Sequence, residues 1–222
     1  MSEEKVKYST STIAEMTGGI ILANFEKDLQ VRETAYQSEA ELERQMIENL
    51  VSQGYERLIV KSNDELYINL KIQIEKLNGV SFTNEEWARF LLEYLDVPND
   101  GMIEKTRKIQ ENYIHDFIFD DGHLKNIKII DKKNIHNNFL QVANQIVGEG
   151  KNRNRYDVTI LVNGLPLVHV ELKKRGVNLH EAFNQIHRYS KESFNSENSL
   201  YKYVQIFVIS NGTYNRYFAN PK

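Results

Sequence analysis

The sequence of 222 residues contains no cysteine. This excludes disulfides, thiolate zinc fingers, iron–sulfur clusters and a cysteine nucleophile, so any bound metal must sit on oxygen or imidazole ligands. Only three prolines and eleven glycines are present, which argues against a long flexible linker. Long hydrophobic runs are missing too, because the first apolar patch spans only residues 18–23. We therefore expect a cytoplasmic protein without a membrane segment.

The composition that remains is typical of a globular chain with one core. Hydrophobic residues make up 41% of the chain and charged residues 27%, and the formal net charge is −3. A chain of this length buries enough apolar surface for one domain, or for one domain with an insertion. Because the chain has no overall basic excess, contact with a nucleic acid would require a local basic surface.

Helical patterns dominate the first half of the chain. Residues 1–36 show no clear period and are interpreted as an extended lead-in. The stretch Ser38–Glu41 resembles a capping box, and it precedes an amphipathic helix that ends at Gly54. A short strand is expected at residues 58–60. Residues 63–112 are then mostly helical, with a second capping box at Thr83 and Glu86, and we interpret them as a helical insertion.

Strand patterns dominate the second half, from residue 113 to residue 222. A helix at residues 179–191 separates the earlier runs from the last two, which predicts an α/β fold with a mixed central sheet flanked by helices. The expected strands are residues 114–119, 126–130, 139–147, 156–162, 167–173, 203–210 and 214–218.

The polar residues of one predicted hairpin form a candidate catalytic site. Side chains alternate along a strand, so His169, Glu171 and Lys173 share a face. Asp157 lies opposite Glu171 only if the loop has three residues, Asn163 to Leu165, or if a bulge compensates for a two-residue turn. A plain two-residue turn would send Asp157 to the other face. The hypothesis therefore predicts a longer loop or a bulge.

Two carboxylates at a strand end suit Mg²⁺, with Mn²⁺ as a substitute. The backbone carbonyl of Leu172 is a further candidate ligand, and Lys173 would orient a water or balance phosphate charge. Such an arrangement fits phosphodiester hydrolysis. A Glu-x-Lys tripeptide is common by chance, however, so the residues alone leave a solvated polar strand face as an equal alternative.

These residues resemble a known set of motifs. Asp157, Glu171-x-Lys173 and the stretch from Gln185 to Tyr189 are similar to the PD-(D/E)xK nuclease motifs followed by the Q-x-x-x-Y motif. More closely, residues 155–168, 171–175 and 182–191 resemble the amino-terminal nuclease region of the R (motor and restriction) subunit of type I restriction-modification enzymes. The similarity extends to residues 36–43, 116–121 and 209–212, and so spans nearly the whole chain.

The resemblance implies a restriction-endonuclease-like PD-(D/E)xK fold in residues 37–222, with the catalytic core at about residues 113–222, acting as a metal-dependent endonuclease on double-stranded DNA. Asp157 and Glu171 would be metal ligands and Lys173 the catalytic lysine, although Tyr156 replaces the motif's proline. Glu43 or Glu39 would be a third acidic residue. The family also implies modification (methyltransferase) and specificity subunits as partners. ATP-driven translocase domains would lie downstream in a longer chain.

Several residues after the strand pair are expected to support the site and bind DNA. Gln185, Arg188 and Tyr189 share a helix face that would support the site and contact the DNA backbone, together with Lys174 or Arg175. Without the resemblance, the same pattern describes an ordinary amphipathic helix covering the sheet. The chain as a whole has an alternative function, as a non-catalytic docking module of the restriction complex. A nuclease from another helicase-coupled restriction system is a second alternative.

Overall fold

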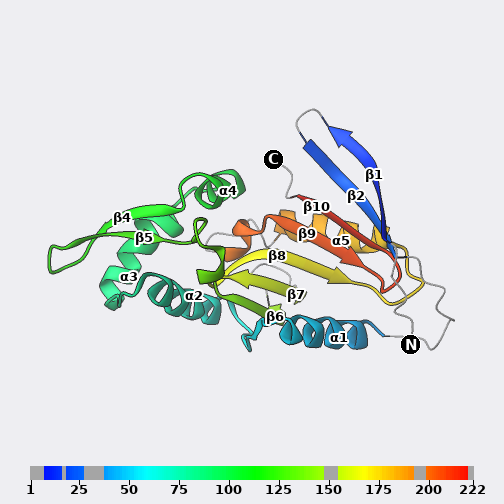
Figure 1. Cartoon of the computed structure of the whole chain (residues 1–222), viewed down its shortest axis with the longest axis horizontal. Helices are drawn as coiled ribbons and strands as arrows, with labels where there is room; N and C mark the ends of the chain where they lie inside the picture. The colour runs from blue at the N-terminus through cyan, green and yellow to red at the C-terminus, as the bar shows by residue number, and fades with distance from the viewer. Residues whose placement is uncertain (1–7, 17–18, 28–37, 148–154, 193–198, 220–222) are drawn as a thin grey trace.

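The computed structural model describes residues 8–16, 19–27, 38–147, 155–192 and 199–219, with side chains in 38–147, 155–188 and 199–219. Within these ranges it has an α/β architecture with a mixed sheet and five α-helices (Figure 1). None of the described helices combines the length and the apolar character needed to cross a membrane.

One sheet of eight strands organises the molecule. The order is β1-β2-β10-β9-β8-β7-β6-β3, in which β8 pairs with β9 and β3 with β6 in parallel, while the other pairs are antiparallel. This confirms the predicted mixed sheet. The strands are β1 (Tyr8–Met16), β2 (Gly19–Lys27), β3 (Glu56–Arg57), β6 (Leu140–Val147), β7 (Arg155–Val162), β8 (Leu165–Leu172), β9 (Ile206–Ser210) and β10 (Asn215–Ala219).

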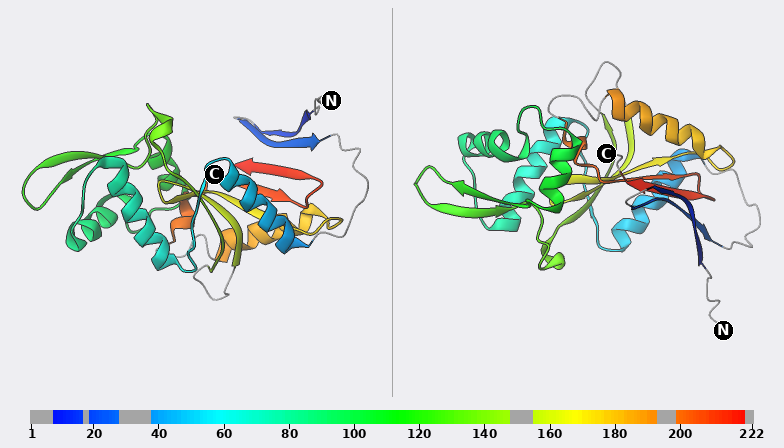
Figure 2. Two further views of the ribbon diagram at one scale, coloured as in Figure 1. Left: turned by 60° about the horizontal axis from the view of Figure 1, so that its bottom comes forward. Right: turned by 90° about the horizontal axis from the view of Figure 1, so that it is seen from above.

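Helices cover both faces of this sheet, as Figure 2 shows from above. Helix α1 (Glu39–Ser52) packs Ile47 against a cluster of valines and Leu172 on one face. Helix α5 (Leu179–Glu192) packs Ala182 and Ile186 against the other face, where the larger core lies. Because strand side chains alternate, residues of β8 contact either α1 or α5 according to their parity.

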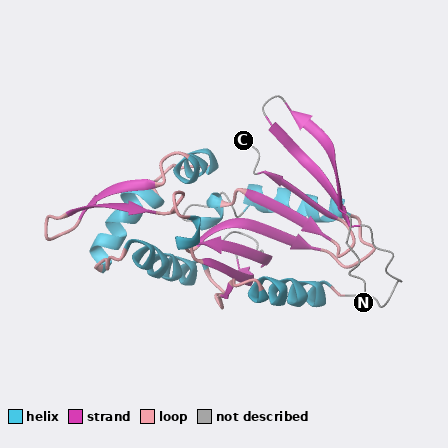
Figure 3. Ribbon diagram, viewed as in Figure 1, coloured by secondary structure: helices cyan, strands magenta, loops and turns pink. Residues whose placement is uncertain are grey.

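An arm extends from one end of the sheet (Figure 3). It contains α2 (Asn63–Asn78), α3 (Asn84–Phe90) continued by a π-helical turn (Leu91–Leu95), and α4 (Met102–Gln110). The predicted helices of residues 63–112 are thus present. The hairpin of β4 (Ile114–Ile118) and β5 (Leu124–Lys128) forms a separate two-stranded sheet on this arm, although the sequence placed it in the core. Its Phe117 is buried among the rings of Phe90 in α3, Phe82 and Phe119.

Several boundaries differ from the expectations for local reasons. Part of the predicted lead-in forms β1 and β2, and β2 pairs with β10 at one side of the large sheet. The expected strand at residues 58–60 is wrong, since β3 precedes it. Residues 200–203 form a 3₁₀ helix before β9. At the helix starts, Thr83 and Glu86 make the predicted reciprocal capping box, whereas Glu41 accepts hydrogen bonds from Arg44 and Gln45 rather than capping back.

The turn between β7 and β8 has the geometry that the candidate site needs. Asn163 and Gly164 form a two-residue turn, with φ values of 51° and 82°. A register shift then follows between Ile160 and Leu161, so the predicted bulge is confirmed. Glycine is required at position 164, because a Cβ built there would lie 2.7 Å from the Cα of Leu70 in α2. The turn is thereby held against the arm.

Candidate active site

The candidate site lies where strands β7 and β8 separate. Their backbone pairing runs from Val162–Leu165 to Val158–Val170 and stops there. Beyond this point β7 pairs with β6, while β8 continues beside β9 as far as Leu172. One step beyond Val158–Val170 lie Asp157 and Glu171. The register set by the bulge, continued by one step, would bring the two carboxylates to the same level at this fork in the sheet.

Asp157 fills the gap between the two strands. Its Oδ2 accepts a hydrogen bond from the backbone N–H of Leu172 at 2.8 Å. Burial, followed by the nearby charge of Glu171, raises the pKa of Asp157 to about 7, against the opposing effects of the Leu172 hydrogen bond and of Lys173. The charge of Glu171 therefore acts on Asp157, which links the two carboxylates electrostatically.

Glu171 is fully buried and lies between two basic side chains. Lys173 Nζ donates to its Oε1 at 3.0 Å, and the Lys173 side chain is 12% exposed. His169 Nε2 lies 3.4 Å from Oε2, but Oε2 has no hydrogen-bond partner among the described residues. The predicted shared face of His169, Glu171 and Lys173 is thus realised. A buried carboxylate oxygen without a hydrogen-bond donor is an unusual and costly feature.

A third carboxylate approaches from α1. Glu43 is buried and accepts hydrogen bonds from Asn144 and from Gln145, the latter at 2.5 Å. Its charge contributes to the raised pKa of Asp157, so it lies near the fork. Glu39, the other candidate, instead accepts a hydrogen bond from the backbone N–H of Lys174 at 3.2 Å. Of the two, Glu43 is the one with an electrostatic link to Asp157.

Gln145 supports the site, but no sequence pattern points to it. Its φ of 55° lies in the left-handed region, where a glutamine is uncommon, and its side chain helps to hold Glu43. Nothing in the local pattern of β6 distinguishes it from an ordinary strand residue. Asn144 was missed for the same reason.

The described side chains include no group of three acidic or histidine residues close enough together to hold a metal. The carboxylates at the fork are Asp157 and Glu171, which are linked electrostatically. Mg²⁺ commonly binds to one or two carboxylates and fills its other positions with water and substrate phosphate. The donor set at the fork therefore fits such an ion, although the protein would supply only part of its coordination shell.

The other predicted residues lie on α5 and just after β8. Gln185 is half-buried and Arg188 exposed on α5, and the backbone of Tyr189 continues the same helix, while its side chain lies outside the described residues. Lys174 and Arg175 are exposed in the segment that leads from the fork to α5. Exposed basic side chains therefore lie both on the segment that follows the fork and on α5.

Comparison with known proteins assigns the chain to a family. The family model of the type I restriction enzyme R protein N terminus matches residues 36–222. The endonuclease subunit of type I restriction enzyme EcoprrI from Escherichia coli is 57% identical over 212 residues, which cover 95% of this chain and 67% of that protein. Type I restriction enzyme endonuclease subunits from Staphylococcus aureus and Staphylococcus saprophyticus are 40% and 37% identical, over 84% and 83% of this chain.

This chain spans only 20% of the length of each of the two staphylococcal relatives. The match with the family model covers the fork, α1 and α5 together. The chain therefore belongs to the family of type I restriction enzyme R proteins, as the sequence motifs predicted, and its described fold is that of their amino-terminal region.

Proposed function

We propose that this chain is a metal-dependent DNA endonuclease of the PD-(D/E)xK type. Asp157 and Glu171 would bind Mg²⁺ or Mn²⁺, and Lys173 would act as the catalytic lysine. The observation that supports this most strongly is the pairing of two carboxylates at the fork, one of them with its pKa raised to about 7. Two such groups repel each other when both are ionised, and a divalent cation between them would remove that repulsion.

The buried environment supports the same assignment. Glu171 Oε2 has no hydrogen-bond donor among the described groups, so it is available to a cation. Two acidic groups in a sheet interior, only partly offset by Lys173 and by the Leu172 N–H, would reduce stability without any benefit to packing. The carbonyl of Leu172 remains a proposed further ligand, and Glu43 a proposed outer one.

Each residue at the fork has a proposed task. Mg²⁺, when bound, would polarise the scissile phosphate and lower the pKa of a water. Asp157 and Glu171 would position the ion, and the hydrogen bond from Leu172 N–H would hold Asp157 in place. Lys173 Nζ, which pairs with Glu171 and reaches solvent, would orient the attacking water or neutralise a phosphate oxygen.

The surrounding residues would position the DNA. Lys174 and Arg188 carry charges suited to phosphates, and Gln185 and Tyr189 lie on the helix beside them. We propose double-stranded DNA as the substrate in the whole protein. Modification and specificity subunits would be its partners, and ATP-driven translocation by downstream domains would precede cleavage. The cytoplasm would be its place of action.

Titration with Mn²⁺ tests the metal site directly. We expect Mn²⁺ to raise the melting temperature of the chain, because an ion that binds only the folded state adds about 2.7 kcal/mol at 100 times its dissociation constant. Asp157→Asn should remove most of this shift, which is measured by thermal unfolding and by calorimetric titration.

Glu111→Gln is the matched control, because Glu111 is an exposed carboxylate at the end of α4. It should bind Mn²⁺ as the unaltered chain does. If saturating Mn²⁺ produces neither heat nor a melting shift in the unaltered chain, the nuclease proposal fails. The alternative role as a docking module would then be favoured.

A further inference from the structure

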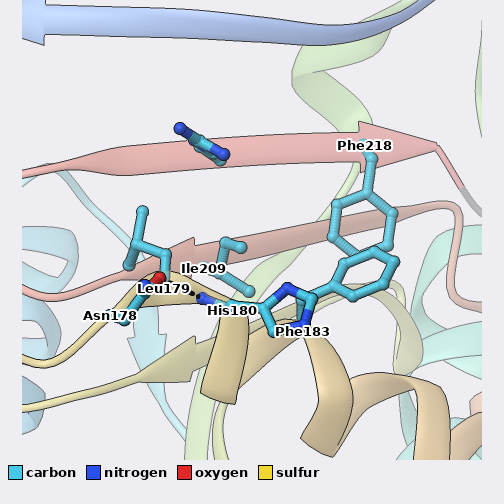
Figure 4. Close-up of a pocket in the computed structure, with 7 residues that line it drawn as sticks. Asn178, Leu179, His180, Phe183, Ile209 and Phe218 are labelled. Carbon is cyan, nitrogen blue, oxygen red and sulfur yellow. Dashed lines mark hydrogen bonds between the residues drawn. The ribbon is translucent and has the colours of Figure 1, made fainter.

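A cavity of about 480 Å³ lies beside the fork, between the start of α5 and strands β9 and β10. Its lining is aromatic and apolar with a few polar groups: Asn178, Leu179, His180, Phe183, Ile209, Arg216 and Phe218. Figure 4 shows Phe183 and Phe218 next to each other, with His180 on the same helix. The volume falls within the range of about 300–1,000 Å³ typical of small-ligand sites.

The cavity and Glu171 share one face of the sheet. Glu171 and Ile209 are register partners in the parallel strands β8 and β9, so their side chains point to the same side. Lys173 N–H donates to Ser210 O at 2.8 Å, and Asn211 Nδ2 donates to Val177 O at 2.9 Å. The segment that leads from the fork to the cavity is thereby fixed to the end of β9.

The aromatic groups of the cavity form an open stacking surface. Phe183 is 41% exposed, although it is a large apolar residue. Its ring lies 5.5 Å from that of Phe218, and it is nearly parallel to the His180 ring, at 6.3 Å and 17°. Exposed aromatic rings are surfaces on which proteins stack unpaired bases.

Charge complements this surface. Arg216, on β10, is exposed and lines the same cavity, and Lys174 and Arg175 lie on the segment between the cavity and the fork. A DNA strand whose scissile phosphate lies at the fork would have its neighbouring phosphates along these cations. Nucleic-acid backbones are recognised by such rows of Lys and Arg.

We propose that the cavity binds one unpaired nucleobase of the DNA strand next to the scissile phosphate. The base stacks on Phe183, and Arg216 contacts the adjoining phosphate. This proposal rests on the proposed nuclease function and adds to it a preference for locally unpaired DNA. The occupant is a nucleobase rather than an aliphatic group, because the aromatic surface is combined with a cation.

The test is binding of a single-stranded oligonucleotide of about 12 nucleotides that carries 2-aminopurine. The full chain is used with EDTA present, so that no hydrolysis occurs and the result does not depend on metal binding. We expect quenching of the base fluorescence, and weaker binding of the same oligonucleotide with an abasic site. Phe183→Ala should weaken binding about 5- to 150-fold and abolish the difference between the two oligonucleotides.

Two further variants separate stacking from charge and from folding. Arg216→Ala should reduce the magnitude of the slope of log affinity against log salt by about 0.7, while Arg216→Lys retains it. Tyr217→Ala is the matched control, because Tyr217 is an exposed aromatic residue on the same strand with the opposite parity to Arg216 and Phe218. It should behave as the unaltered chain does.

The proposal is overturned if the unaltered chain binds base-containing and abasic oligonucleotides equally, or if Phe183→Ala and Tyr217→Ala have equal effects. It is also overturned if the oligonucleotide does not bind. None of these results would bear on metal binding at the fork, which Mn²⁺ titration tests separately. Conversely, stacking without Mn²⁺ binding would contradict the nuclease function and leave the base site in place.

Discussion

Replacing Glu171 with glutamine is expected to reduce DNA cleavage by the assembled restriction enzyme by about 1,000-fold or more. A bound metal ion contributes several kcal/mol to the stabilisation of a phosphoryl transition state, and about 1.4 kcal/mol corresponds to each factor of ten in rate. Glutamine keeps the shape of Glu171 and still offers an acceptor to Lys173 Nζ, which lies 3.0 Å from the carboxylate. The loss should therefore come from the missing charge and not from unfolding.

Cleavage of supercoiled plasmid measures this effect, and thermal unfolding shows whether the fold is intact. Glu111→Gln removes an equal charge from an exposed position on the arm and should cleave at the normal rate. A Glu171→Gln enzyme that is folded and cleaves within about 3-fold of the normal rate would refute the role of this residue.

Asparagine at position 157 is expected to stabilise the metal-free chain at pH 8, by up to about 4 kcal/mol. The pKa of Asp157 rises from the ordinary 3.8 to about 7 on folding, mainly through burial and secondarily through Glu171. Between these two values the folded chain holds a proton that the unfolded chain has lost. Stability from this group is therefore greatest below about pH 4, and it decreases as the pH rises to about 7.

The measurement is denaturant unfolding from pH 4 to pH 8 in EDTA. The unaltered chain should lose stability relative to Asp157→Asn across this range, and the two curves should become parallel above about pH 7. Asp116→Asn, on the exposed face of β4, supplies the control and should follow the unaltered chain. An Asp157→Asn chain that is less stable at pH 8, or a difference that does not vary with pH, would contradict the electrostatic coupling at the fork.

The carboxylates at the fork are expected to lower the stability of the metal-free fold in favour of metal binding. We expect Asp157 to destabilise the metal-free fold at neutral pH, and a divalent cation to reverse that effect. Residues optimised only for folding would not place two carboxylates at a buried fork. We therefore expect the order of stability of Asp157→Asn and the unaltered chain to reverse when saturating Mn²⁺ is added.

Local patterns predicted much of this fold. The alternation of His169, Glu171 and Lys173 predicted their shared face. The parity of the hairpin predicted the bulge between Ile160 and Leu161. The capping box at Thr83 fixed the start of a helix because both of its hydrogen bonds are local. Such features depend on residues a few positions apart, which is why the sequence reveals them.

Long-range features were not predictable in this way. The hairpin β4–β5 has an ordinary strand pattern, and contacts with Phe90 of α3 and with Asn78 of α2, distant in the sequence, hold it on the arm. The left-handed φ of Gln145 depends on tertiary contacts, including its hydrogen bond to Glu43. The cavity likewise joins Phe183 to Arg216, which are far apart in the chain. Contacts between residues so far apart in the sequence leave no local pattern from which they could be predicted.

Anomalous diffraction from a crystal of the chain soaked in Mn²⁺ tests the central claim most directly. Binding at the fork predicts a manganese peak in contact with Asp157 and Glu171, with Lys173 beside it. A fully occupied crystal form in which saturating Mn²⁺ leaves no peak between these two carboxylates would contradict it.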